Sequence, residues 1–132
     1  MINYCNEIFD AVATDLRERF TGIRVVGEYE TTPSTFPTVT LDETVNVPVH
    51  LDSATRNKYA RLQYRVQVFS NRESGKRAEA RYIYGMLDTK MQELGLFCTT
   101  YTTTPAIYNS EIYCITATYE CVVREDGVVY RG

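Results

Sequence analysis

The sequence predicts an α+β fold, in which two helices pack on one face of a single, mostly antiparallel mixed sheet. Apolar residues follow a helical period near the start of the chain and again in its middle, and most remaining segments alternate like strands. The chain has 132 residues, of which 44% are hydrophobic and 23% charged. This length and balance are typical of one globular domain, so we expect a single domain over residues 1–132.

The first element is predicted to be a helix over residues 3–20. Its apolar side chains recur every four positions, at Tyr4, Ile8, Val12, Leu16 and Phe20. Residues 23–28 then form a short predicted strand. A turn-rich segment around Pro33 leads into a second strand over residues 38–42, which alternates with period two.

The segment at about 46–59 is expected to be a long, mobile excursion between strands. Val45, Val47 and Val49 alternate, but Pro48 cannot donate a ladder hydrogen bond, and a polar run follows. Residues 60–70 show the cleanest alternation of the chain and predict a strand.

A turn at residues 71–75 leads into a predicted second helix, which ends at Leu94 because Gly95 permits a left-handed residue there. Its apolar stripe is Ala80, Ile83, Leu87, Met91 and Leu94. Strands are then predicted over residues 96–103 and 111–123, with a loop over residues 105–109 between them. Asp126 and Gly127 predict a hairpin turn into a last strand over residues 128–130.

No set of residues has the spacing of a catalytic or metal site. His50 is the only histidine, and the cysteines at 5, 98, 114 and 121 form no C-x-x-C pair, so reduced thiols are expected. The stretch 70–76 lacks the first glycine of a phosphate-binding loop and the hydroxyl residue after its lysine. We therefore expect no catalytic residue, no metal and no cofactor, in a protein that is not an enzyme.

Charge and tyrosine content favour protein contacts over nucleic-acid binding. Fourteen basic against seventeen acidic residues give a net charge of −3, which provides no global field for a phosphate backbone. Eleven tyrosines suit protein interfaces, although tyrosines that cap the core of a small sheet are the alternative. The candidate interface residues are Arg56, Lys58, Arg61, Tyr113, Tyr119 and Tyr130.

Lys76, Arg77 and Arg81 form a second basic group, within two turns of the second helix. They make either a basic rim or an ordinary solvated helix face. No stretch reaches the roughly 18 apolar residues of a membrane helix, and the N-terminus lacks the features of a signal peptide. We therefore expect no membrane association and folding in a cytoplasm.

Several stretches resemble the tail terminator (tail completion) proteins of long-tailed bacteriophages. The main ones are 64–71 (YRVQVFSN), 75–80 (GKRAEA) and 91–97 (MQELGLF), and further matches are Phe36-Pro37-Thr38-Val39, Asp42-Glu43, Pro105, Asn109, Ile112-Tyr113 and Tyr119. The resemblance covers about 95 residues, between positions 36 and 130. The sequence departs from the family pattern at Cys98 and Cys114, near which relatives often have a basic residue.

The resemblance implies a structural virion protein that assembles into a six-membered ring. Such a ring caps the head-proximal end of the tail tube, stops tube growth and offers a joining surface to the head connector. The implied partners are further copies of the chain, the tail tube protein, and a head-tail connector or head-closure protein. DNA would pass through the channel without specific binding. The implied location is the head-tail junction of the virion, after assembly in the host cytoplasm.

Three other functions are compatible with the sequence. The protein could be a head-closure or other neck component, which would differ in the neighbours that it touches. It could be a nucleic-acid-binding α+β module, which would need exposed aromatic residues among basic ones on one sheet face. It could be a small enzyme that uses Asp42, Glu43 or His50, although their spacing does not favour this.

Overall fold

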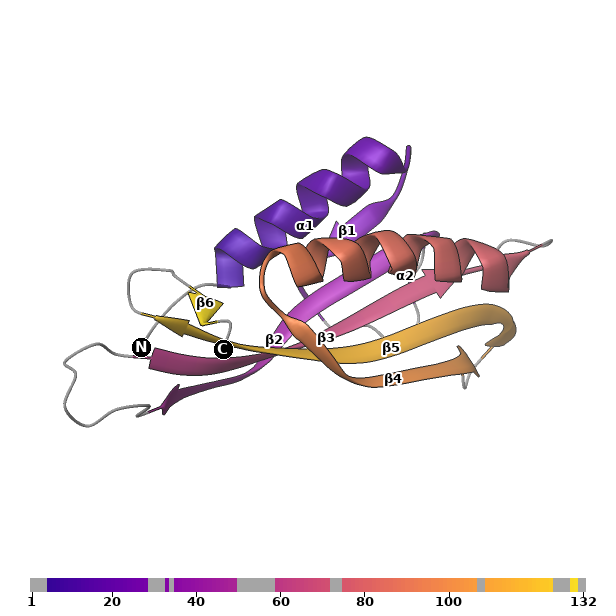
Figure 1. Ribbon diagram of the computed structural model, residues 1–132. Helices are drawn as coiled ribbons and strands as arrows, with labels where there is room; N and C mark the ends of the chain where they lie inside the picture. The colour runs from indigo at the N-terminus through magenta and orange to yellow at the C-terminus, as the bar shows by residue number, and fades with distance from the viewer. Residues whose placement is uncertain are drawn as a thin grey trace, which may run out of the picture.

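The predicted α+β class is confirmed by the computed structural model, which describes residues 5–28, 33, 35–49, 59–71, 75–106, 109–124 and 129–130. The elements, drawn in Figure 1, are α1 (Cys5–Arg19), β1 (Arg24–Val26), β2 (Thr38–Val49), β3 (Tyr59–Ser70), α2 (Lys76–Glu93), β4 (Phe97–Ala106), β5 (Asn109–Arg124) and β6 (Val129–Tyr130).

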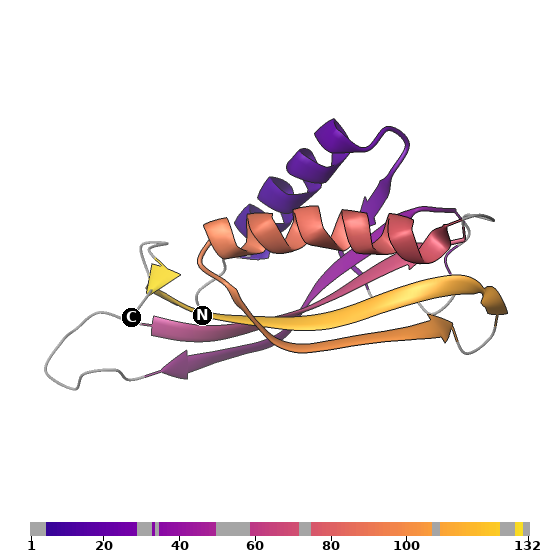
Figure 2. The same cartoon turned by 45° about the vertical axis from the view of Figure 1, so that its right-hand side comes forward.

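The strands form one mixed sheet in the order β1-β2-β3-β5-β4. Only β1 and β2 run parallel, and every other pair is antiparallel. The short β6 pairs with the end of β5, on the edge of β5 that β4 also uses. Both helices lie on the same face of the sheet, as Figures 1 and 2 show from two directions, so the predicted arrangement is confirmed.

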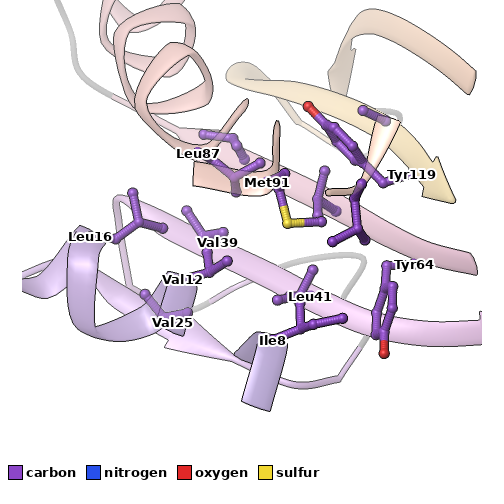
Figure 3. Close-up of a cluster of buried hydrophobic side chains, with 14 of the residues drawn as sticks. Ile8, Val12, Leu16, Val25, Val39, Leu41, Tyr64, Leu87, Met91 and Tyr119 are labelled. Atoms are coloured by element: carbon purple, nitrogen blue, oxygen red, sulfur yellow. The ribbon is translucent and has the colours of Figure 1, made fainter. Parts of the chain in front are cut away.

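The core lies between this sheet face and the two helices. From α1, Ile8, Val12 and Leu16 are fully buried, which confirms the apolar stripe that predicted the helix. They lie with Val25, Val39 and Leu41 of the first two strands and with Leu87 and Met91 of α2 (Figure 3). The rings of Tyr64 and Tyr119 belong to the same cluster.

Helix α2 ends at Glu93, one residue before the predicted end at Leu94, which caps it. The amide of Leu96 donates to the carbonyl of Met91 over 3.0 Å, and Gly95 has a φ of 91°. This pairing closes the last turn of a helix when a residue without a side chain takes the left-handed conformation. Leu96 and Met91 are both buried, so the chain leaves the helix toward the core.

The alternation predicted for β3 is confirmed on its helix-covered side. Leu62, Tyr64, Val66 and Val68 are all fully buried there. On the opposite side, Arg61 is exposed and Arg65 is partly buried, but Gln67 is buried.

The expected excursion at about 46–59 is wrong at its start, because β2 continues to Val49. Residues 46–49 pair with residues 59–62 of β3, after a register shift at Thr44. Strand β1 pairs only with residues 38–40 of β2, so the part of β2 around Pro48 is an edge among the described strands. Proline is tolerated at such an edge because no described strand on that side requires its missing N–H. Residues 50–58, the remainder of the predicted excursion, lie outside the described residues.

Strands β4 and β5 are longer than predicted. Strand β4 reaches Ala106 and β5 starts at Asn109, so most of the loop predicted at 105–109 is strand. The turn predicted at Asp126 and Gly127 lies outside the described residues. The strands on its two sides pair antiparallel, Val122 opposite Tyr130 and Val123 opposite Val129, as a hairpin requires.

Candidate functional site

The sheet face away from the helices is called the open face here. By the strand register it bears the side chains of Asp42, Val45, Val47, Arg61, Gln63, Arg65, Thr116, Thr118, Glu120, Val122, Phe97, Thr100 and Thr102. Most of these side chains are either polar and uncharged, or charged and paired with an opposite charge on a neighbouring strand. A face of this size that neither helix covers is available to another molecule.

The two arginines of the open face are matched by carboxylates on neighbouring strands. Arg65 makes two hydrogen bonds to Asp42, at 2.9 Å and 3.3 Å, in the forked geometry that guanidinium and carboxylate favour. Arg61 lies 3.8 Å from Glu120 on the other side of β3. The positive charge of this face is therefore largely compensated within the chain.

One end of the same face is apolar and closed. Phe69, Ile112 and Cys114 are buried in a small cluster, and Phe36 packs against it. Burial raises the pKa of the Cys114 thiol, with a hydrogen bond to Thr116 acting in the opposite direction. This end therefore contributes to stability and leaves the polar part of the face free.

The predicted interface residues do not form one surface. Arg61 is exposed on the open face, as an interface residue must be. Arg56 and Lys58 lie outside the described residues. Tyr130 lies in β6, where its backbone pairs with Val122, and the structure describes nothing of its side chain.

The prediction that Tyr113 and Tyr119 are interface residues is wrong, because both side chains are buried in the core. Tyr119 is fully buried and Tyr113 is 6% exposed, both on the helix-covered side of β5. The alternative, that tyrosines cap the core of a small sheet, holds at these two positions. Sequence alternation fixed their shared face but not which face the helices cover.

The hydroxyl of Tyr119 is held by α2. It donates to Asp88 Oδ1 over 2.5 Å, so the Tyr84 hydroxyl, 2.7 Å away, must donate to the Tyr119 oxygen. Burial, together with the Asp88 and Tyr84 hydrogen bonds, raises the pKa of Tyr119 far above its usual range. Tyr119 is therefore a neutral structural residue that joins the sheet to the helix.

Strand β4 bears two exposed aromatic side chains that were not predicted from the sequence. Phe97 is 56% exposed and Tyr101 is 46% exposed. Tyr101 packs against Tyr84 of α2, with ring centres 5.0 Å apart. Strand β4 has no partner on its outer edge among the described strands. The outer edge of β4 therefore offers both backbone hydrogen-bonding groups that pair with no described strand and exposed aromatic side chains. The alternation of residues in the sequence could not show that β4 is an edge strand.

A groove of about 640 Å³ separates the end of α1 from the start of α2. Its lining includes Phe20 and Tyr82, whose rings meet edge to face with centres 5.6 Å apart. Tyr82 is 62% exposed. The groove was not predicted, because it depends on how two distant helix ends meet.

The described residues contain no group of three histidine, cysteine, aspartate or glutamate side chains placed to hold a metal ion. Cys98, Cys114 and Cys121 are free thiols, and burial raises the pKa of Cys121 to about 12. Neither α1 nor α2 is long and apolar enough to cross a membrane.

The fold is similar to that of a known virion component. No protein-family model matches the sequence, and no curated protein matches it. Among solved structures, the chain is similar to one in the virion of a native gene transfer agent particle, with a TM-score of 0.56 and 12% sequence identity. The similarity covers 84% of this chain and 90% of that one. At this identity the match establishes a common fold.

Proposed function

We propose that this protein is a structural component of a tailed, phage-like particle, and specifically a tail terminator. The observation that supports this most is the fold shared with a chain of a gene transfer agent virion over 84% of the present chain. Two of the stretches that resemble tail terminators are residues 64–71, which cover the end of β3, and residues 91–97, which run from the end of α2 to the start of β4. In this role the chain works by contact with copies of itself and with neighbouring virion proteins, without catalysis.

The ring would have six members and would sit on the last ring of tail tube protein at the head-tail junction. One side of the ring would match the tube, and the other would meet the head-tail connector or head-closure protein. Stopping a polymer requires that the outward side resemble the tube subunit too little to accept another ring.

The open face suits the wall of a channel through which DNA passes without being held. Binding to DNA grows with the number of phosphates that unpaired lysines and arginines neutralise. On this face Arg65 is paired with Asp42 and Arg61 with Glu120. The threonines and glutamine between them are uncharged. A passing phosphate backbone therefore meets little uncompensated positive charge.

Tail assembly with and without this chain tests the proposal. We expect tubes of uniform length, joined to heads, when the chain is present, and tubes of uncontrolled length when it is omitted. Adding the purified protein back should restore uniform length. Tubes of normal length that fail to join heads would contradict the terminator role and favour a head-closure protein. Normal, infectious particles without the chain would exclude both.

A further inference from the structure

The helix layer bears exposed charges of opposite sign that form no ion pair with any described residue. Glu7, Asp10 and Glu18 are exposed on α1, and Arg77 and Arg81 are exposed on α2. None of these five side chains takes part in an ion pair with another described residue. Isolated charges are common on protein surfaces, so unpaired charges alone do not indicate a binding site. The positions of these five charges on the two helices are therefore the relevant observation.

The three carboxylates lie along one line of α1, which we call the acidic stripe. Positions 7, 10 and 18, with Thr14 between them, are separated by three or four residues, which places them on one side of a helix. The buried residues Val12 and Leu16 lie on the other side. The acidic stripe therefore points away from the core.

The two arginines, which we call the basic patch, lie on the side of α2 that faces β4 and β5. The Arg77 guanidinium lies 5.8 Å from the centre of the Tyr113 ring of β5. Burial acts to raise the pKa of Tyr113, but the Thr103 hydroxyl and the Arg81 and Arg77 charges outweigh it and lower that pKa. The patch is thus a site of positive potential at the β4 edge, beside the exposed ring of Tyr101.

The acidic stripe and the basic patch lie on opposite flanks of the helix layer. The other side of α2 faces α1, since Tyr82 contacts Phe20 there and Arg19 donates to the Met86 sulfur over 3.6 Å. Arg77 and Arg81 lie on the side of α2 away from Met86, because nine and five residues separate them from it along the helix. Helix α1 extends the helix layer on the Met86 side of α2. Figure 2 shows the two helices side by side. The positive and negative sites of one copy therefore cannot meet each other.

We propose that the acidic stripe on α1 of one copy docks against the basic patch on α2 of the next copy. A contact between two different patches on opposite flanks leaves one of each free, so it repeats from copy to copy until a ring closes. Because the chain carries a net charge of −3, copies repel one another at long range, and local complementarity is needed to fix their orientation. The exposed ring of Tyr101, which packs on the half-buried Tyr84, adds apolar area near the basic patch. This contact deepens the proposed ring and rests on it.

Sedimentation equilibrium of the full chain, at low and at high salt, tests the contact. We expect the wild-type chain to associate, and to associate less at high salt, because exposed charge pairs are screened. The variant Arg77→Glu/Arg81→Glu should weaken self-association by at least about 30-fold. The variant Glu7→Lys/Asp10→Lys/Glu18→Lys should weaken it as much. Lys90→Glu and Glu28→Lys serve as controls outside both sites and should leave association within about threefold of wild type.

Mixing the two charge-reversed variants gives the decisive outcome. Each variant offers like charges on both flanks, but an equimolar mixture again places opposite charges together, so association should return in the mixture alone. Circular dichroism of each variant checks that it is folded. A wild-type chain that stays monomeric up to about 1 mM, or a mixture that associates no better than its components, would overturn the proposal.

The same experiment separates this contact from the proposed function. Six-membered rings that persist in both reversed variants would overturn the contact and leave the terminator ring standing. Charge-dependent association that produces only open filaments would support the contact and contradict the ring.

Discussion

The Tyr119 hydroxyl of β5 donates a 2.5 Å hydrogen bond to the carboxylate of Asp88 on α2. This bond crosses the boundary between sheet and helix at a position where the Tyr119 ring is fully buried. Tyr84 donates to the same hydroxyl from the neighbouring turn of the helix. The three side chains fix how α2 sits on the sheet, and with it the orientation of the basic patch.

Replacing Tyr119 by Phe should lower the free energy of unfolding by about 1–3 kcal/mol, because Asp88 loses a buried donor and Tyr84 loses its acceptor. Tyr113→Phe is the matched control. The Tyr113 hydroxyl is buried and makes no hydrogen bond of good geometry to any described residue, although Thr103 and Arg81 act on it, so its loss should cost less than the loss of the Tyr119 hydroxyl. Urea unfolding of the three chains measures both changes. Equal destabilisation by the two substitutions would contradict this assignment.

Glu43→Gln should make stability less dependent on pH. Burial raises the pKa of Glu43, although hydrogen bonds from Tyr64 and Asn46 oppose the rise. The folded state therefore holds this proton more tightly than the unfolded state. The resulting stability is present below the ordinary glutamate pKa of about 4.5 and is lost as pH rises through the folded pKa. Unfolding measured from pH 4 to pH 7 should show a smaller decline for Glu43→Gln, and an unchanged profile would refute the interpretation.

Releasing the arginines of the open face should create DNA binding. In Asp42→Asn/Glu120→Gln, Arg65 and Arg61 lose their carboxylates, so DNA affinity should rise and its logarithmic salt slope should steepen by about two. Glu18→Gln/Glu28→Gln removes the same charge at two exposed carboxylates that form no ion pair with a described residue, so it should have little effect. Fluorescence anisotropy with labelled duplex DNA gives both values. Strong binding by the wild-type chain at physiological salt would contradict a channel wall that lets DNA slide.

Deleting residues 53–57 should leave the subunit folded and weaken its contacts. Val49 and Tyr59 pair directly, so the shortened connection of four residues still has the length of a common hairpin loop. The deletion removes Arg56, one of the proposed interface residues. Unfolding and sedimentation of the deleted chain measure the two effects separately. Loss of folding would place the segment in the core instead.

The sequence predicted the elements whose signal is local. Strand β3 was identified because Leu62 to Val68 alternate without interruption, and α2 because its stripe ends at Gly95. The extension of β2 past Pro48 was not predicted, because it depends on the fact that no described strand other than β3 pairs with that part of β2. The alternation of residues within one segment does not show whether that strand lies at the edge of the sheet or in its interior.

The candidate site was less predictable than the fold, because it depends on packing between distant segments. Tyr119 was expected at an interface, yet its hydroxyl partner Asp88 lies 31 residues earlier in the chain. Tyr101 was not singled out, although it is exposed beside α2. A tyrosine in a strand can be buried or exposed, and only the position of the helices decides between the two.

Immunogold labelling of this chain on intact particles tests the central claim most directly. If the protein is a structural component of the head-tail junction, we expect one compact cluster of gold at the point where capsid and tail meet. Gold distributed along the tail, on the capsid shell or at the distal tip, or particles that carry no label at all, would contradict the account.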